Sequence, residues 1–314
     1  MKRLLYLFSL LILLSCSEES DITVNNQTDS PERYNQQIFT NITITQNVQY
    51  GTNITLAGIN VDLFMDIYEP ENDTEINRPL IVLAHGGSFT SGDKTGLDEF
   101  ASFLAKSGYV VASINYRLLD INYSELALKQ AVVNAISDMK AAVRFFKKDN
   151  ITTDSYKIDP SNIFIGGASA GAITALHYAY LNSDTELITI GGNNFLDYVN
   201  SHGGLDGNSG NANYSSDIKG IINISGGLFK ATFVNAGEPI LFSVHGTSDP
   251  IVPYNQGAVN FSNVIIEGSG LIHPVATSVG IQNQLITIEN GGHNAFLTCS
   301  ECQSETRAFI FLNL

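Results

Sequence analysis

Short, continuous apolar runs alternate with helix-length segments over most of the chain, and this pattern constrains the fold more than any other feature. A strand is apolar throughout when helices cover both faces of its sheet, which is typical of parallel sheets with right-handed crossovers. The pattern predicts strands at 80–84, 110–115, 162–166, 218–224, 240–245 and 284–289, and helices at 97–106, 125–148, 170–181, 256–263 and 302–312. We therefore expect an α/β fold with a mostly parallel central sheet flanked by helices.

Two further segments depart from this alternation. Residues 42–50 and 61–68 alternate between apolar and polar side chains, which predicts an antiparallel strand pair before the parallel part. Residues 182–217 are rich in Gly, Asn and Ser and are longer than a usual connection, so they form either a lid-like insertion or a flexible surface loop. Residues 38–314 are predicted to form a single catalytic domain.

The N-terminus has the pattern of an export signal. Lys2 and Arg3 precede an apolar run, Leu4 to Leu14, that is too short to span a bilayer, and Leu-Leu-Ser then leads into Cys16. This resembles a bacterial lipobox, which implies a lipoprotein signal peptide over 1–15 and acylation of Cys16. We expect a flexible tether over 16–37 and a lipid anchor in a bacterial membrane, most simply the outer membrane, facing the periplasm or the cell surface. An ordinary secretory signal is the alternative, and a Cys16→Ala variant that still fractionates with membranes would contradict the anchor.

The net charge of the chain restricts the molecules that it can bind. The 16 Lys and Arg residues against 31 Asp and Glu residues give a net charge of −15, which repels nucleic acid and anionic bilayers. A neutral or weakly charged small-molecule or glycan substrate is easier to accept than a polyanion, and the simpler alternative is that the acidity only keeps an exported protein soluble. The sequence has no phosphate-binding loop and no group of residues at metal-ligand spacing, so we expect no cofactor and no metal. It leaves the oligomeric state open.

The motif Gly167-Ala168-Ser169-Ala170-Gly171 stands between a predicted strand and a predicted helix. A side chain at so tight a strand-to-helix turn is forced into a strained backbone conformation, and small neighbours leave room for that turn. The helix N-terminus also favours nearby negative charge. Ser169 is therefore the candidate nucleophile.

A serine nucleophile needs a base, and the base needs a carboxylate. His293 lies between glycines and asparagine in the loop after the last predicted strand, whereas His177 fits a core position and His202 and His273 have no supporting context. Asp249 follows the strand 240–245, at the sheet edge where ligands bind in open α/β sheets. We predict Ser169, Asp249 and His293 as a catalytic triad.

Two smaller motifs complete the set. His85-Gly86-Gly87-Ser88 follows the strand 80–84, where a glycine-rich backbone can turn its amides toward an oxyanion, with His85 orienting the loop. Cys299 and Cys302 form a C-x-x-C pair, which in an oxidising compartment is most simply a local disulfide at the start of a helix.

From about Val61 to the C-terminus, these motifs resemble an α/β-hydrolase of the carboxylesterase/lipase group with an HGG oxyanion loop. The resemblance implies an oxyanion hole made of the amides of Gly87, Ser88 and Ala170. Ser88 stands where that group usually has a third glycine. The implied activity is that of a serine esterase acting on short-acyl or glycan-linked esters. The alternatives are a serine peptidase or amidase of the same fold, and a binding protein without catalysis.

Overall fold

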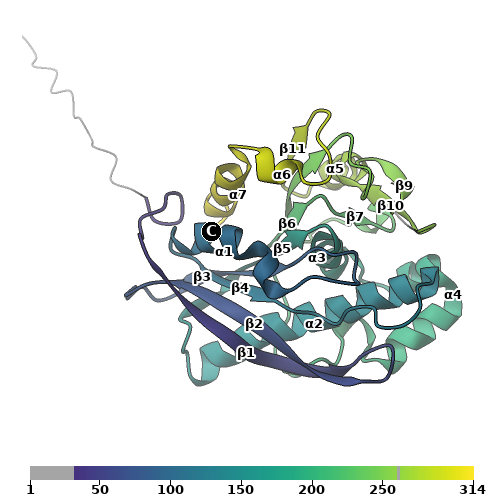
Figure 1. Cartoon of the computed structure of the whole chain (residues 1–314), viewed down its shortest axis with the longest axis horizontal. Coiled ribbons are helices and arrows are strands. Elements are labelled where there is room, and N and C mark those ends of the chain that lie inside the picture. Colours follow the sequence, from purple (N-terminus) through teal and green to yellow (C-terminus); the bar gives the residue numbers. More distant parts are fainter. Residues whose placement is uncertain (1–31, 260–261) are drawn as a thin grey trace, which may run out of the picture. The chain divides into compact units, whose positions relative to one another are not determined.

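The computed structural model describes residues 32–259 and 262–314, and its main feature is one sheet of eight strands (Figure 1). The strands, in spatial order, are β1 (Ile42–Ile54), β2 (Asn60–Pro70), β4 (Val110–Ile114), β3 (Arg78–Ala84), β5 (Ile158–Ala168), β6 (Gly220–Ile224), β8 (Ile240–Gly246) and β11 (Asn283–Ile288). β1 pairs antiparallel with β2, and β2 pairs antiparallel with β4. The remaining neighbours are parallel, which confirms the predicted fold class.

The predicted strands are apolar throughout because both faces of the sheet are covered. In β3, Leu80 and Val82 belong to one buried cluster. Ile81 and Leu83 belong to the other cluster, on the opposite face. Successive side chains of β3 therefore lie on opposite faces of the sheet, and the side chains on both faces are apolar.

The helices divide between these two clusters. Apolar side chains of α1 (Asp98–Ala105), α6 (Ala295–Thr298) and α7 (Cys302–Phe311) belong to one cluster. Those of α2 (Glu125–Thr152), α3 (Ala170–Tyr180), α4 (Asp184–Ser201) and α5 (Ser269–Ser278) belong to the other. Three short 3₁₀ helices complete the set: η1 (Lys94–Leu97), η2 (Gly204–Asp206) and η3 (Ala231–Phe233).

The predicted helix at 256–263 is wrong. The chain there forms β9 (Gln256–Ala258), which pairs antiparallel with β10 (Ile265–Gly268) in a small three-stranded sheet that also contains β7 (Gly227–Leu228). Gly257 packs so closely on Pro253 that a Cβ there would lie 2.8 Å from its ring. A helix, α5, does form nearby at Ser269–Ser278. The sequence analysis did not predict it because it contains Pro274, and proline disfavours the interior of a helix.

The segment 182–217 is more regular than expected, since α4 and η2 occupy much of it. Ser183 and Glu186 form a capping box that starts α4. The rest is attached to α2: the Lys140 Nζ donates to the Leu205 carbonyl at 2.7 Å, and the buried Arg117–Asp138 ion pair also contacts the Ser209 hydroxyl. Of the two alternatives given for this segment, the flexible surface loop does not describe residues 184–201, which form α4.

The folded domain begins earlier than residue 38. The Tyr34 amide donates to the Ser107 carbonyl at 2.8 Å, and Arg33 pairs with Asp73. The predicted signal peptide and the lipidation site at Cys16 lie outside the described residues, so they stay predictions. Within 32–259 and 262–314, no helix combines the length and the apolar character needed to cross a bilayer.

Candidate active site

Ser169 lies at the sharp turn between β5 and α3. Its backbone has φ 54° and ψ −117°, a region that residues other than glycine rarely adopt. Two backbone hydrogen bonds hold it there: its amide donates to the Ile224 carbonyl at 2.8 Å, and its carbonyl accepts from the Ile173 amide at 2.9 Å. The strained backbone predicted at this turn is confirmed.

The glycines on either side of Ser169 are required by contact with β3. A Cβ on Gly167 would lie 2.2 Å from the Ala84 carbonyl oxygen, and a Cβ on Gly171 would lie 2.0 Å from the same atom. Since a backbone carbonyl in the middle of a sheet cannot move aside cheaply, neither position accepts a side chain. The two glycines let the first turn of α3 approach the end of β3.

Asp249 and His293 come from loops that are hydrogen-bonded to each other. The Ser248 amide donates to the Gly291 carbonyl at 2.9 Å, and the Asn290 amide donates to the Thr247 hydroxyl at 2.8 Å. This brings the His293 Nδ1 to 2.7 Å from the Asp249 Oδ2. Nδ1 donates to the carboxylate, so Nε2 is the ring nitrogen that can accept a proton.

The Asp249 carboxylate is fully buried and surrounded by donors. Its Oδ1 accepts from the amides of Ile251 and Val252, and its Oδ2 lies 3.3 Å from the His245 Nε2. Burial alone would raise the pKa of Asp249, but hydrogen bonds from His245, His293 and the two amides outweigh it and hold that pKa well below its usual value. The carboxylate is therefore ionised at neutral pH.

This depressed pKa makes a testable contribution to stability. The unfolded chain protonates Asp249 near the ordinary aspartate pKa of about 3.9, whereas the folded protein resists protonation until lower pH. The stabilisation is thus complete above about pH 5 and is lost as pH falls below the unfolded pKa. We expect the difference in free energy of unfolding between wild type and Asp249→Asn to narrow from pH 5 to pH 2 in urea titrations. A constant difference would contradict the ionised, donor-bound carboxylate.

The loop after β3 has an unusual backbone. Gly87, Ser88 and Phe89 have φ values of 119°, 55° and 61°, so three successive residues lie in the left-handed region. This explains why the related group usually has glycine at the position of Ser88. Gly86 lies directly against the Ser169 turn, since a Cβ on it would be 3.3 Å from the Ser169 Cβ.

His85 is buried beneath this loop. Its Nδ1 lies 2.6 Å from the Gly86 carbonyl oxygen, and its ring stacks on Tyr116 with centroids 4.5 Å apart. The Tyr116 hydroxyl donates to the His85 carbonyl at 2.9 Å. Burial lowers the pKa of His85, which favours a neutral ring that donates from Nδ1 to Gly86. These contacts agree with an orienting role for His85.

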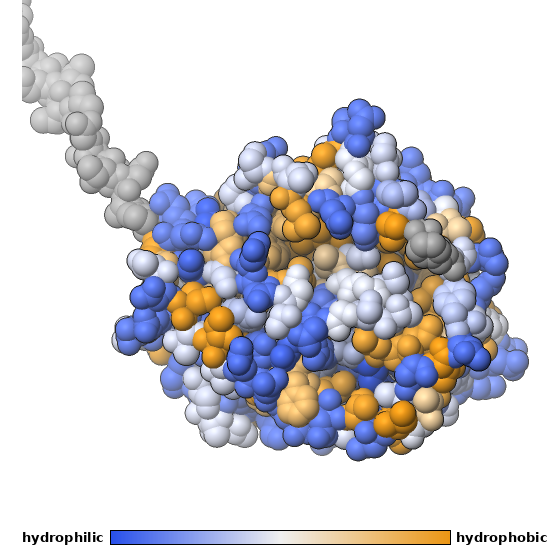
Figure 2. All heavy atoms as spheres, viewed as in Figure 1, coloured by the Kyte–Doolittle hydropathy of each residue, from blue (hydrophilic) through white to orange (hydrophobic). Residues whose placement is uncertain are grey.

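Ser169 lies where two cavities adjoin. One cavity of about 590 Å³ is lined mainly by apolar side chains, and the other, of about 800 Å³, has more polar lining and includes His293. Both cavities include Gly87, Ser88 and Ser169, and Ala170 lines the first. Figure 2 shows a hollow on one face of the molecule, with apolar residues inside it and hydrophilic residues around it. The structure thus brings the predicted catalytic and oxyanion residues to one place.

The segment 182–217 contributes no residue to the lining of either cavity. The walls of the first cavity come instead from α2, α3 and the β9–β10 hairpin, with the loops after β3 and β8. Those of the second come from η1, α1, α6 and α7, with the loops after β3, β6, β8 and β11. A lid role for the segment stays a prediction without support from its position.

Two residues of the site escaped the sequence analysis. His245 is completely buried, with its Nε2 near both Asp249 and the Val252 carbonyl and its Nδ1 2.9 Å from the Ser269 hydroxyl. The Ser225 hydroxyl donates to the His293 carbonyl at 3.0 Å. His245 lies four residues before Asp249 in the sequence, and this short spacing could have pointed to His245 as a neighbour of the carboxylate.

The other histidines lie elsewhere. His177 is buried in the core, as predicted, and burial lowers its pKa to about 4. It also accepts from the Phe229 amide. His273 contacts Asn283, and His202 is exposed. Among the described residues, no group of three or more His, Cys, Asp or Glu side chains could hold a metal ion.

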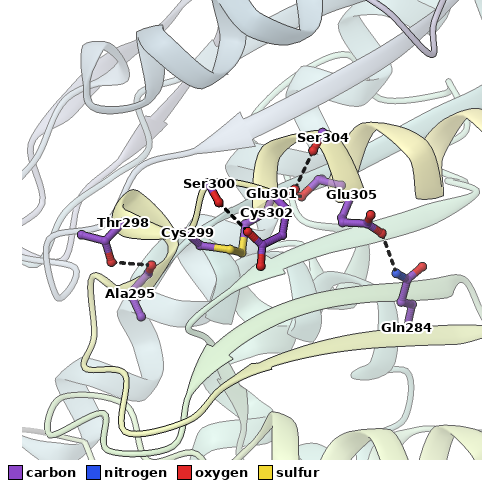
Figure 3. Close-up of a disulfide and its surroundings, with 10 residues drawn as sticks. Gln284, Ala295, Thr298, Cys299, Ser300, Glu301, Cys302, Ser304 and Glu305 are labelled. Carbon is purple, nitrogen blue, oxygen red and sulfur yellow. Dashed lines mark hydrogen bonds between the residues drawn. A yellow bond between two sulfur atoms is a disulfide. The ribbon is translucent and has the colours of Figure 1, made fainter.

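Cys299 and Cys302 form a disulfide between the end of α6 and the start of α7 (Figure 3). The Thr298 hydroxyl donates to the Ala295 carbonyl, and Gln284 of β11 reaches Glu305 of α7. The disulfide thus ties the segment after His293 to a helix that packs on the sheet.

The parallel sheet, the strained serine turn and the Asp-His pair at the carboxyl ends of the strands together define an α/β-hydrolase. The family model named BD-FAE matches residues 65–228, which include the serine turn and the loop after β3. This chain belongs to the BD-FAE family.

Curated relatives cover only part of this protein. Esterase-5C of Drosophila miranda is 25% identical over 177 residues, which are 53% of this chain and 31% of the relative. The neuroligin-like protein glit-1 of Caenorhabditis elegans is 29% identical over 112 residues, which are 35% of this chain and 15% of the relative. The chain therefore spans less than a third of the length of these relatives.

Solved structures match over most of the chain. Esterase 2 of Thermogutta terrifontis, phosphoramylated by tabun, has a TM-score of 0.63 at 17% identity and covers 87% of this chain and 95% of its own. A truncated carbohydrate esterase from gut microbiota has a TM-score of 0.61 at 18% identity, with coverages of 86% and 96%. At such identities the likeness establishes the shared fold.

Proposed function

We propose that this chain is a serine carboxylic-ester hydrolase, with Ser169 as nucleophile, His293 as general base and Asp249 as the carboxylate that orients the base. The single observation that carries the proposal is the hydrogen bond between the His293 Nδ1 and the Asp249 Oδ2, beside a cavity that His293 shares with Ser169. This arrangement leaves the His293 Nε2 free to accept a proton.

The reaction proceeds in two steps. His293 takes the proton of the Ser169 hydroxyl as its oxygen attacks the ester carbonyl, and the carbonyl oxygen becomes an oxyanion held by the amides of Gly87, Ser88 and Ala170. The intermediate collapses, the C–O bond to the alcohol breaks, and His293 donates the proton to the leaving alcohol. Water, deprotonated by His293, then attacks the acyl-enzyme and releases the acid and Ser169.

The strained turn supports the assignment of Ser169. At φ 54° the residue requires a surrounding structure that enforces its conformation, and the hydrogen bonds to Ile224 and Ile173 supply it. Such strain is concentrated at functional sites, where it positions a reacting group. A binding protein without catalysis would have no need for it.

Glycan-linked esters are the first substrate class to test. The chain's net charge of −15 disfavours polyanionic substrates, and one structural neighbour is by name a carbohydrate esterase. The same machinery cleaves amides, so a peptidase is the second candidate.

The test compares p-nitrophenyl esters with aminoacyl p-nitroanilides on the purified protein. We expect measurable kcat/KM for esters, and values at least 100-fold lower for every anilide. An organophosphate such as paraoxon should abolish turnover and leave its diethylphosphoryl group on the peptide that contains Ser169, with release of p-nitrophenol. Faster turnover of anilides would favour the peptidase, and no turnover of either class would favour a binding protein.

A further inference from the structure

His245 is a second histidine beside the Asp249 carboxylate, and the two-step reaction gives it no part. It is the next to last residue of β8 and is completely buried. Its Nε2 lies 3.0 Å from the Val252 carbonyl oxygen and 3.3 Å from the Asp249 Oδ2. Its Nδ1 lies 2.9 Å from the hydroxyl of Ser269, the first residue of α5. One imidazole thus connects a strand, the loop that carries Asp249 and a helix.

The neighbours of His245 determine which of its nitrogens carries the hydrogen. The Val252 carbonyl and the ionised Asp249 carboxylate can only accept, so Nε2 must carry a hydrogen. The Asn223 Nδ2 donates to the Ser269 hydroxyl at 3.1 Å, which leaves the hydrogen of that hydroxyl free for Nδ1. The donors from Asn223 through Ser269 to His245 therefore all point toward Asp249, and a neutral ring with its hydrogen on Nε2 satisfies them.

Val252 connects this ring to the carboxylate by a second route. Its carbonyl accepts from the His245 Nε2, and its amide donates to the Asp249 Oδ1 at 3.0 Å. Without the imidazole, the Val252 carbonyl and the Ser269 hydroxyl would each lose a partner inside the protein. Because buried polar groups are stable only when hydrogen-bonded, the loop would shift to find other partners. Asp249 would then move with the loop.

The position of the Asp249 Oδ2 in turn determines the position of the general base. This oxygen accepts from the His293 Nδ1 at 2.7 Å, and the carboxylate is fully buried whereas His293 is partly exposed. The imidazole of His293 therefore takes its orientation from a carboxylate that other groups must fix. A displacement of about 1 Å in a catalytic group can cost about 100-fold in rate.

We propose that His245 is a positioning residue of the catalytic site: as a neutral ring with its hydrogen on Nε2, it holds Asp249 and the Val252 peptide in place and so sets the orientation of His293. The ring does not touch the substrate, since it lines neither cavity at Ser169. This inference rests on the proposed function and deepens it, because it adds a residue that acts only through Asp249.

The first test removes the imidazole. His245→Leu should lower kcat for p-nitrophenyl butyrate about 30- to 100-fold. It should change KM less than threefold, because both steps use His293 and slow together. His245→Gln, whose amide can donate near the place of Nε2 and accept from Ser269, should restore kcat to within about fivefold of wild type. Wild-type kcat in folded His245→Leu, or no recovery in folded His245→Gln, would overturn the proposal.

Ser269→Ala serves if His245→Leu does not fold. It removes only the hydroxyl that donates to the His245 Nδ1, so we expect a smaller loss in kcat, about threefold to tenfold, again with little change in KM. A wild-type kcat in this variant would count against the chain of donors that ends at Asp249.

A double-mutant cycle shows whether His245 acts through Asp249. In the Asp249→Asn background there is no carboxylate to position, so the addition of His245→Leu should lower kcat less than threefold further. A contribution to general stability alone would lower kcat by the same factor in both backgrounds. Equal factors would therefore overturn the positioning role.

The matched control is His273→Leu. His273 is also buried and lies one turn after Ser269 on α5, but its Nδ1 lies 2.7 Å from the Asn283 Oδ1, away from the Asp249 loop. The same substitution there should leave kcat within threefold of wild type. An equal loss at both positions would show that damage to this region, rather than the position of Asp249, lowers the rate.

A second measurement does not depend on turnover. Nitrogen-15 NMR of protein labelled in the imidazole rings should show His245 as the neutral tautomer with its hydrogen on Nε2 at pH 8, and His245→Gln assigns the signal by its loss. The other tautomer, or an imidazolium at that pH, would overturn the proposal.

The outcomes also distinguish this inference from the proposed function. If Ser169→Ala abolishes turnover while His245→Leu keeps wild-type kcat, the protein is a serine esterase in which His245 does not position Asp249. If wild type and Ser169→Ala hydrolyse the ester equally, the proposed function itself fails.

Discussion

Replacement of Ser169 by alanine is expected to lower kcat for p-nitrophenyl ester hydrolysis by about 10⁴- to 10⁶-fold. Alanine removes only the hydroxyl oxygen, while the hydrogen bonds from the backbone of residue 169 to Ile224 and Ile173 can remain. The amides of the loop after β3 are also unaffected, so a small residual rate from oxyanion stabilisation should persist. Stopped-flow and steady-state assays on wild type and variant measure the ratio.

A matched variant separates this effect from general damage. Ser278→Ala removes an exposed hydroxyl at the end of α5, whose Oγ donates to the Val275 carbonyl. It should leave kcat within twofold of wild type, and both variants should unfold in urea near the wild-type midpoint. Wild-type turnover in folded Ser169→Ala would remove Ser169 from the chemistry.

Replacement of Asp249 by asparagine is expected to lower kcat by about 10⁴-fold with little change in KM. The carboxylate accepts from the His293 Nδ1, and in the proposed mechanism it stabilises the imidazolium that forms after proton transfer. An asparagine amide directed at Nδ1 can donate a hydrogen bond and favour the tautomer in which Nε2 carries the proton. His293 would then be unable to accept the proton of Ser169.

The control for this prediction is Asp120→Asn, which alters an exposed carboxylate that accepts from the Ala57 amide. It should retain kcat within twofold of wild type. Because raising the pH favours the deprotonated serine hydroxyl, the loss in Asp249→Asn should also become smaller in strongly alkaline buffer. A kcat for Asp249→Asn within tenfold of wild type at neutral pH would contradict the role of this carboxylate.

The positions of most strands along the chain and the serine turn could be predicted from the sequence because each is encoded locally. The apolar run 80–84 is buried on both faces, and the small residues on either side of Ser169 satisfy a steric requirement of the turn itself. The strands at 110–115, 162–166 and 240–245 all appear, with ends that shift by a few residues. The disulfide pair lies three residues apart, so it too is a local feature.

The errors lie where contacts between distant residues override local preference. Residues 256–258 form a strand because β10 supplies backbone partners for them, and α5 contains Pro274 although proline disfavours a helix interior. The position of 182–217 away from both cavities depends on its contacts with α2.

The sequence by itself determined the fold class and the residue types at the site: a serine at a strained turn, and an aspartate and a histidine in loops after two later strands. These follow from hydrophobic period and from steric limits that act over a few neighbouring residues. Only the tertiary structure decided that the Ser225 hydroxyl bonds to the His293 carbonyl, and that an apolar and a more polar cavity adjoin at Ser169. Both depend on contacts between side chains of separate elements, and such contacts cannot be predicted from a local pattern in the sequence.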